Sequence, residues 1–169
     1  EWSTKPSRDK ISDEGVFEVQ YEGEIADQRL PAVSFDVPAT MSFAGESVPL
    51  DIPDVHERLD KELQINCYLH SNTIFLIKRA NRWFPEMEKI LKKYDIPEDF
   101  KYLPLIESNL LNVISHREAV GYWQILKTSG TELDLEITGE VDERYDPLKA
   151  TEAACKYLKR SYKKFGNWT

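Results

Sequence analysis

The stretch from Phe100 to Gln124 constrains the fold of this chain more than any other, because an acidic residue ends an apolar helical pattern there. The apolar residues at helical spacing are Tyr102, Leu103, Leu105 and Ile106. Glu107 follows them directly, where a carboxylate is costly unless it has a partner or a task. Polar residues and a loop come next, and the pattern predicts a second helix from Gly121 to about Glu132.

The residues alone allow two interpretations of Glu107. In the first, its carboxyl only forms a hydrogen bond at a helix end, and composition by itself favours this one. In the second, burial against apolar side chains disfavours the charged form, so that Glu107 stays a proton donor near neutral pH.

Helical patterns cover most of the chain after residue 54, so we predict an all-α domain. The expected helices begin at Asp54 as N-cap, run over 71–82, restart after Pro85, and end with a long helix from Asp146-Pro147 to Gly166. Small and aromatic side chains give this last helix a face suited to close packing. The acidic segment 134–146 lacks the alternating ligands of a calcium loop and is expected to be a solvated connection.

The first 39 residues have little helical periodicity and are predicted to form an extended acidic arm or linker, ahead of a domain at 40–169. The alternation of Phe17, Val19 and Tyr21 suggests one edge strand or one docking strip within the arm. Residues 40–54 carry more apolar anchors, and we expect them to lie in irregular form along the domain surface.

Charge is concentrated near the N-terminus. Residues 1–54 hold four basic and twelve acidic side chains and so account for the whole net charge of −8. The remaining residues are balanced and show no basic footprint, which argues against a nucleic-acid partner.

The cysteines and histidines indicate neither a metal site nor a cofactor. Cys67 and Cys155 lie in helical patterns with apolar neighbours, which favours buried free thiols, with a disulfide as the alternative. His56, His70 and His116 are isolated and have no metal-ligand spacing. No apolar run approaches the roughly 20 residues of a membrane span, so membrane attachment would need an upstream signal or anchor.

Several motifs in order resemble the lytic murein transglycosylases of the SLT, goose-lysozyme-like family. The likeness is strongest to the membrane-bound D type of the Bacteroidetes group and covers residues 40–169. The motifs are Ile106-Glu-Ser108, Ser115, Ala119-Val-Gly-Tyr-Trp-Gln124, Val141-Asp-Glu-Arg-Tyr-Asp-Pro147 and Ala150-Thr-Glu-Ala-Ala-Cys-Lys-Tyr-Leu158, with Ser42-Phe-Ala-Gly-Glu-Ser-Val-Pro-Leu50 and Ser71-Asn-Thr73.

This resemblance implies a lysozyme-like helical fold that acts on peptidoglycan glycan strands. The family cleaves the β-1,4 bond between N-acetylmuramic acid and N-acetylglucosamine without water and leaves a 1,6-anhydro end. Glu107 would be the sole catalytic acid and base, which reverses the preference for a merely structural carboxyl. Two alternatives remain: a lysozyme-type hydrolase of the same fold, and an inactive glycan-binding module.

The resemblance also implies a set of substrate-binding residues: Ser108, Ser115, Gly121, Tyr122, Trp123 and Gln124. The serine hydroxyls would orient Glu107 or the sugar, and the amide of Gln124 would bind an N-acetyl or hydroxyl group. For Trp123, core packing is an equal alternative to sugar contact.

The family's third motif, Ala-Tyr-Asn, would follow Thr169, so we expect the chain to be truncated at its C-terminus and to have low activity by itself. The family also implies a monomer in the periplasm or cell envelope, outer-membrane anchored in the full-length protein.

Overall fold

The computed structural model describes residues 35–168, except for the side chain of His70. The expected arm therefore lies almost wholly outside the described residues, as do Phe17, Val19 and Tyr21. The boundary at residue 39 stays a prediction.

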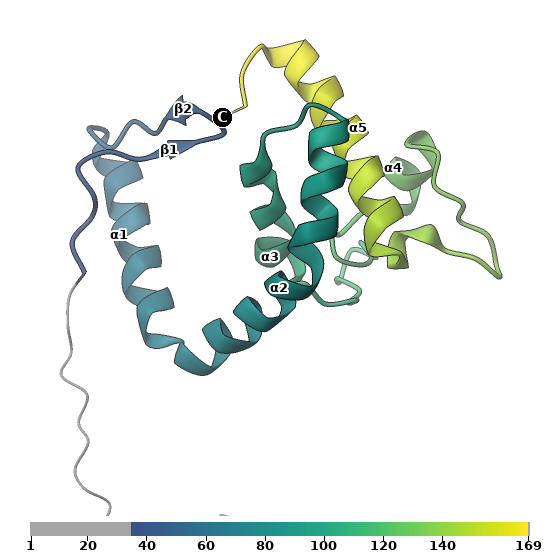
Figure 1. Ribbon diagram of the computed structural model, residues 1–169, viewed down its shortest axis with the longest axis horizontal. Coiled ribbons are helices and arrows are strands. Elements are labelled where there is room, and N and C mark those ends of the chain that lie inside the picture. The colour runs from purple at the N-terminus through teal and green to yellow at the C-terminus, as the bar shows by residue number, and fades with distance from the viewer. Residues whose placement is uncertain (1–34, 169) are drawn as a thin grey trace, which may run out of the picture. The chain divides into compact units, whose positions relative to one another are not determined.

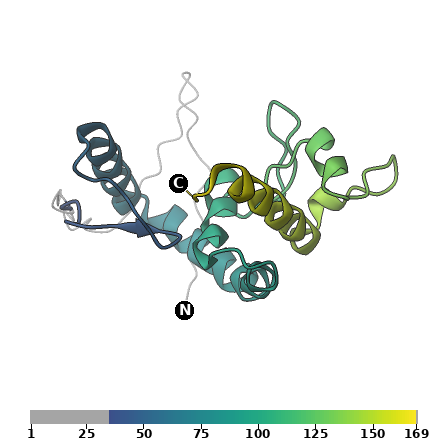
Figure 2. The same ribbon diagram turned by 90° about the horizontal axis from the view of Figure 1, so that it is seen from above.

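The described residues are mainly helical, which confirms the all-α prediction (Figure 1). In chain order the helices are α1 (Pro53–Tyr68), α2 (His70–Lys93), η1 (Glu98–Tyr102), α3 (Leu103–Ser108), α4 (Lys127–Glu132), η2 (Glu143–Tyr145) and α5 (Pro147–Phe165). Figure 1 shows α1 on one side of α2, and α4 with the loop that follows it on the other; the view from above agrees (Figure 2). Helix α5 packs along α2.

Helix α2 runs without a break through Pro85, so the prediction of two separate helices there was wrong. A proline inside a helix costs about 3 kcal/mol because it removes one hydrogen bond and crowds the preceding turn. Just beyond it, Met87 and Leu91 lie one turn apart and are fully buried. Their burial contributes about 1.5–3 kcal/mol each, which offsets the proline.

The main core lies where α2 and α5 meet the segment between α3 and α4. Its buried side chains are Met87, Leu110, Tyr122, Trp123, Ile125, Leu133, Leu135, Ala150, Ala153 and Ala154. The three alanines form the close-packing face predicted for α5, whereas Tyr157, also expected on that face, is 56% exposed. Helix α5 also begins and ends as predicted: the Asp146 carboxylate accepts from the backbone N–H groups of Leu148 and Lys149, and Gly166 ends the helix with φ 78°.

A small hairpin precedes the helices, with strand β1 (Ser42–Phe43) antiparallel to β2 (Glu46–Ser47). Both residues of its turn have positive φ, which matches the twist of paired strands. The Phe43 ring lies edge-on to that of Phe100 at 5.3 Å, and Phe100 meets Trp168 in the same way at 5.2 Å. The expectation of a wholly irregular 40–54 segment is therefore wrong at the hairpin.

The acidic segment after α4 is more ordered than a solvated connection. Leu135 is buried, and Ile137 pairs with Asp142 in an isolated bridge. Two of the acids that suggested a solvated loop accept hydrogen bonds within it: Asp142 accepts from the buried Arg144, and Glu143 accepts from the backbone N–H of Glu136.

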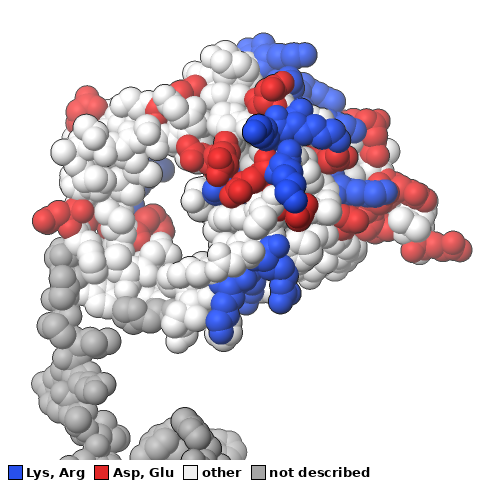
Figure 3. Space-filling view, in the orientation of Figure 1, with Lys and Arg blue, Asp and Glu red and all other residues white. Residues whose placement is uncertain are grey.

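The two cysteines are free thiols, Cys155 buried and Cys67 half buried. Burial raises the pKa of the Cys155 thiol to about 12, which keeps it neutral and unreactive. None of the helices within residues 35–168 is long and apolar enough to cross a bilayer. On the face shown in Figure 3, Lys and Arg side chains gather over α5 and α2, whereas α1 presents mainly uncharged and acidic side chains.

We predict that Asp146→Ala lowers the free energy of unfolding by about 1 kcal/mol, because two backbone donors of α5 lose their acceptor. Asp54→Ala is the matched control. The sequence suggested Asp54 as the N-cap of α1, but Ile52 occupies that position and Asp54 pairs with Arg58 at the surface. Urea unfolding followed by circular dichroism measures both; equal losses would contradict the assignment of the caps.

Candidate functional site

Glu107 lies in the last turn of α3 with its side chain exposed to solvent. It forms no hydrogen bond or ion pair with any residue in the described part of the chain. The expectation of a carboxyl buried among apolar side chains is therefore wrong. Helix α3 has six residues, and the side chains it buries fully are Pro104 and Ser108, one turn apart. Ile106, expected inside, is 78% exposed and lies beside Glu107 in the sequence.

The chain reverses direction immediately after α3. Asn109 and Leu110 both adopt left-handed backbone conformations, with φ of 54° and 53°. Such conformations are rare outside glycine and often mark functional segments. Leu110 is held there by burial of its side chain in the core, and the carbonyl of Asn109 accepts a hydrogen bond from Arg79 Nη1 at 3.0 Å.

Ser108 connects α3 to the next segment. Its buried hydroxyl lies 2.9 Å from the carbonyl oxygens of both Pro104 and Tyr122. The hydroxyl therefore points into the protein, where it fixes the end of α3 against the turn that contains Tyr122.

Residues 121–124 form a tight turn, and the predicted second helix begins only at Lys127. Gly121 and Gln124 have φ of 78° and 48°, which no helix accommodates. The backbones of Val120 and Ile125 close the turn by exchanging two hydrogen bonds of 3.1 Å.

The side chains of the turn point in different directions. Tyr122 is buried with its ring edge-on to Trp83 at 5.4 Å, and Trp123 is buried with Nε1 donating to Thr151 Oγ1 at 2.8 Å. For Trp123 this supports core packing over sugar contact. Gln124 is half buried, and its Nε2 donates to the carbonyls of Gly121 and Val113.

Ser115 is half buried at the start of the same loop, and its hydroxyl accepts from the backbone N–H groups of Arg117 and Ala119. It therefore shapes the loop that leads to the turn. The structure brings Ser108 and Tyr122 together and places Gln124 in the same turn; Ser115 contributes through the loop backbone.

Arg144 lies within the motif Val141–Pro147, but its contacts were not predicted; its side chain is only 7% exposed. Its guanidinium binds the Asp142 carboxylate through Nε and Nη2, and Nη1 donates to the carbonyls of Glu118 and Ile125. The hydrogen bonds from Arg144 lower the pKa of the Asp142 carboxyl, which favours its charged form. The partners are up to 26 residues away in sequence, so spacing alone could not reveal them.

Several exposed apolar side chains come from the last residue of η1, from α3, which carries Glu107, and from the loop between α3 and α4. They are Tyr102, Ile106, Leu111, Val113, Ile114 and Leu126. An exposed carboxyl can donate or accept a proton, and exposed apolar side chains can contact the apolar face of a sugar ring. Within the described residues, no group of three or more His, Cys, Asp or Glu could hold a metal ion.

Residues 86–169 match the sequence model of the family described as "Transglycosylase SLT domain". This chain carries an SLT domain. The match begins within α2 and includes every predicted site residue from Glu107 to Gln124.

Two curated relatives agree with the family match. The "Membrane-bound lytic murein transglycosylase D" of Escherichia coli strain K12 is 30% identical over 132 residues, which is 75% of this chain and 28% of the relative. A "Putative tributyltin chloride resistance protein" of Alteromonas sp. strain M-1 is 28% identical over 103 residues, or 60% of this chain and 50% of the relative. The chain thus spans between about a quarter and a half of the length of these relatives.

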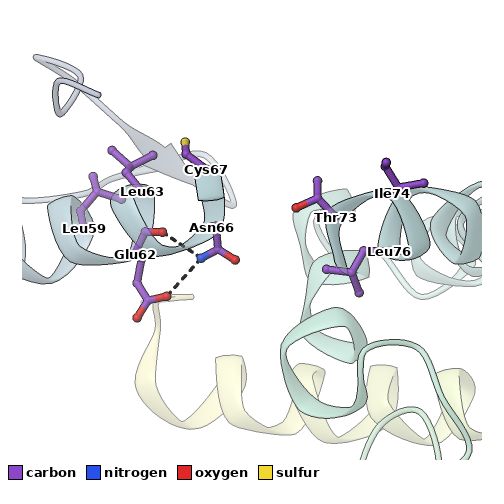
Figure 4. Close-up of a pocket in the computed structure, with 8 residues that line it drawn as sticks. All are labelled: Leu59, Glu62, Leu63, Asn66, Cys67, Thr73, Ile74 and Leu76. Atoms are coloured by element: carbon purple, nitrogen blue, oxygen red, sulfur yellow. Dashed lines mark hydrogen bonds between the residues drawn. The ribbon is translucent and has the colours of Figure 1, made fainter. Parts of the chain in front are cut away.

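A groove of about 580 Å³ lies between α1 and the first turns of α2 (Figure 4). Its lining is Leu59, Glu62, Leu63, Asn66, Cys67, Thr73, Ile74 and Leu76, and it includes none of the predicted site residues. Glu62 is its only carboxylate, and Asn66 Nδ2 donates to both Glu62 Oε2 and the Glu62 carbonyl. The groove therefore lies outside the residues that match the SLT family, and its lining is mainly apolar.

We predict that Gly121→Ala destabilises the SLT domain by more than about 3 kcal/mol. A Cβ at Gly121 would overlap the Arg144 carbonyl oxygen, and φ is 78°. Gly166→Ala has the same φ and free space, so it should cost about 1 kcal/mol. Gly139→Ala, with neither constraint, should change stability by less than about 0.5 kcal/mol.

Thermal unfolding of the three variants tests this order. If Gly121→Ala were no worse than Gly166→Ala, the close approach of Arg144 to the turn would be wrong.

Proposed function

We propose that this SLT domain cleaves peptidoglycan as a lytic transglycosylase, with Glu107 as its single catalytic acid and base. The observation that carries the proposal is the match of residues 86–169 to the SLT family. The 30% identity to a protein named as a lytic murein transglycosylase supports it. Peptidoglycan lies in the cell envelope, so we also propose that the domain works there.

In the proposed reaction, the Glu107 carboxyl first donates its proton to the oxygen of the glycosidic bond, which then breaks. The resulting carboxylate takes the proton of the muramoyl C6 hydroxyl as that oxygen bonds to the anomeric carbon. The proton balance closes on one residue, because the acid of the first step is the base of the second. The nucleophile belongs to the substrate, so the second carboxyl of ordinary glycosidases is not needed.

An exposed carboxyl must still be protonated for the first step, and we propose that the glycan itself provides the cover. Glu107 follows Ile106, whose side chain is largely in solvent, and Tyr102, the last residue of η1, is also exposed. A sugar chain lying on these side chains would remove water from the carboxyl, and desolvation favours its uncharged form.

The remaining predicted site residues form two groups: those with a polar atom still available to bind substrate, and those that are buried or bonded within the protein. Gln124 uses its Nε2 within the protein, so we propose that its Oε1 accepts a hydrogen bond from an N-acetyl or hydroxyl group. Ser108, Gly121, Tyr122 and Trp123 are buried, and we propose that they support the site from beneath. Ser115 would act by shaping the loop that leads to the turn.

We predict that Glu107→Gln lowers cleavage of purified murein sacculi by at least about 100-fold, because the amide can neither donate nor accept the proton. Glu132→Gln is the control, since Glu132 is also exposed and lies in α4. Release of soluble muropeptides measures both variants. Unchanged turnover in Glu107→Gln would remove Glu107 from any catalytic role, whereas no turnover by the unaltered chain would favour the inactive glycan-binding module.

We also predict that products formed in ¹⁸O-labelled water carry 1,6-anhydro ends and no ¹⁸O, because the internal hydroxyl attacks. A lysozyme-type hydrolase would instead give reducing ends heavier by one labelled water. Mass spectrometry of the muropeptides distinguishes the two, and labelled reducing ends as the main product would contradict the transglycosylase proposal.

A further inference from the structure

We propose that Arg144, held by Asp142, is a positioning residue that sets the conformation of the turn at Gly121–Gln124 and thereby the placement of Gln124 and Glu107. The inference rests on the proposed function for its catalytic consequence. Its structural half concerns only contacts between residues of this chain.

Arg144 binds both ends of the segment 118–125, which contains the turn. Its Nη1 donates to the carbonyl of Glu118 at 3.3 Å on one side and to that of Ile125 at 3.2 Å on the other. Asp142 fixes the guanidinium by accepting from Nε at 2.9 Å and from Nη2 at 2.7 Å. Planar, two-point binding of this kind specifies orientation as well as charge, which a lysine cannot reproduce.

The backbone beside Arg144 holds the same segment from a second direction. The carbonyl of Arg144 lies so close to Gly121 that no side chain fits there. The next carbonyl, that of Tyr145, accepts from Asn112 Nδ2 at 2.9 Å. Arg144 thus contacts the segment at both ends through Nη1 and at its middle through its carbonyl, while Tyr145 binds Asn112 in the loop that precedes the segment.

The backbone conformation of this segment is unfavourable for its residues and needs contacts with other residues to persist. Glu118 and Gln124 both have positive φ, 60° and 48°, and neither is a glycine. Strained residues of this kind persist only where the surroundings determine them, and they gather at functional sites. The contacts of Arg144 lie at one of these residues and next to the other.

The turn at Gly121–Gln124 is also linked to Glu107. The carbonyl of Tyr122 meets the Ser108 hydroxyl, and Ser108 directly follows Glu107 in the last turn of α3. A change at Arg144 therefore reaches the carboxyl through one turn and one side chain, while Gln124 moves with the turn itself.

Lys101 provides a matched control, because it is another largely buried cation that pairs with two carboxylates. Its side chain is 13% exposed and binds Glu88 at 2.8 Å and Glu98 at 2.6 Å. It has no contact with the turn among the hydrogen bonds of the described residues. Loss of Lys101 should lower overall stability without acting on the turn.

The test uses the whole chain and compares Arg144→Lys, Asp142→Asn and Lys101→Met. Hydrogen exchange followed residue by residue should show the Val120 and Ile125 amides exchanging at least about tenfold faster in the first two variants. Exchange at Met87 and Leu91 should be unchanged there. In Lys101→Met the two turn amides should keep their protection relative to the core. Asp142→Asn keeps the arginine in place and gives an answer if Arg144→Lys folds poorly.

Initial rates of anhydro-product formation supply the catalytic half. In Arg144→Lys we expect kcat to fall about 10- to 100-fold, because the carboxyl is misplaced, while KM changes less than about threefold. Unchanged exchange at Val120 and Ile125 would overturn the inference whatever the activity. Faster exchange with unchanged kcat would overturn the link to Glu107. If the unaltered chain forms no anhydro product, the proposed function fails, and the exchange result still decides whether Arg144 sets the turn.

Discussion

The burial of Tyr122 and Trp123 between α2 and α5 is the interaction on which the rest of the site depends. The Trp123 indole bonds to Thr151 of α5, and the Tyr122 ring rests against Trp83 of α2. With both side chains fixed, the Tyr122 carbonyl becomes a rigid acceptor for Ser108, so the end of α3 is defined by the packing of two long helices. A tight turn is thereby given the rigidity that proton transfer at a fixed distance requires.

The sequence predicted the elements whose signals are local. Asp146, Pro147 and Gly166 mark the ends of α5 in the residues themselves, and its alanines mark the face that packs. The turn at 121–124 was missed because its apolar pattern also fits a helix, and the positive φ of Gly121 and Gln124 distinguishes the two only in the structure. The role of Arg144 was missed because the carbonyls to which it donates, those of Glu118 and Ile125, are far from it in sequence, and composition cannot show such contacts.

For Glu107, the sequence predicted the position in the helix correctly and the environment of the side chain wrongly. Spacing placed it at the end of an apolar helix, which it is, but α3 is so short that only one narrow face reaches the core. The acid therefore meets solvent, and the family match rather than burial supports its role. We therefore propose that the bound glycan desolvates the carboxyl and that the protein holds the carboxyl in place.

A crystal structure of Glu107→Gln with a bound muramoyl tetrasaccharide tests this account most directly, because the variant should bind the sugar without cleaving it. The account predicts a glycosidic oxygen within about 3 Å of the residue 107 side chain, the sugar covering that side chain and Ile106, and Gln124 contacting the same ligand. A sugar bound instead in the groove between α1 and α2, with residue 107 still in open solvent, would contradict it.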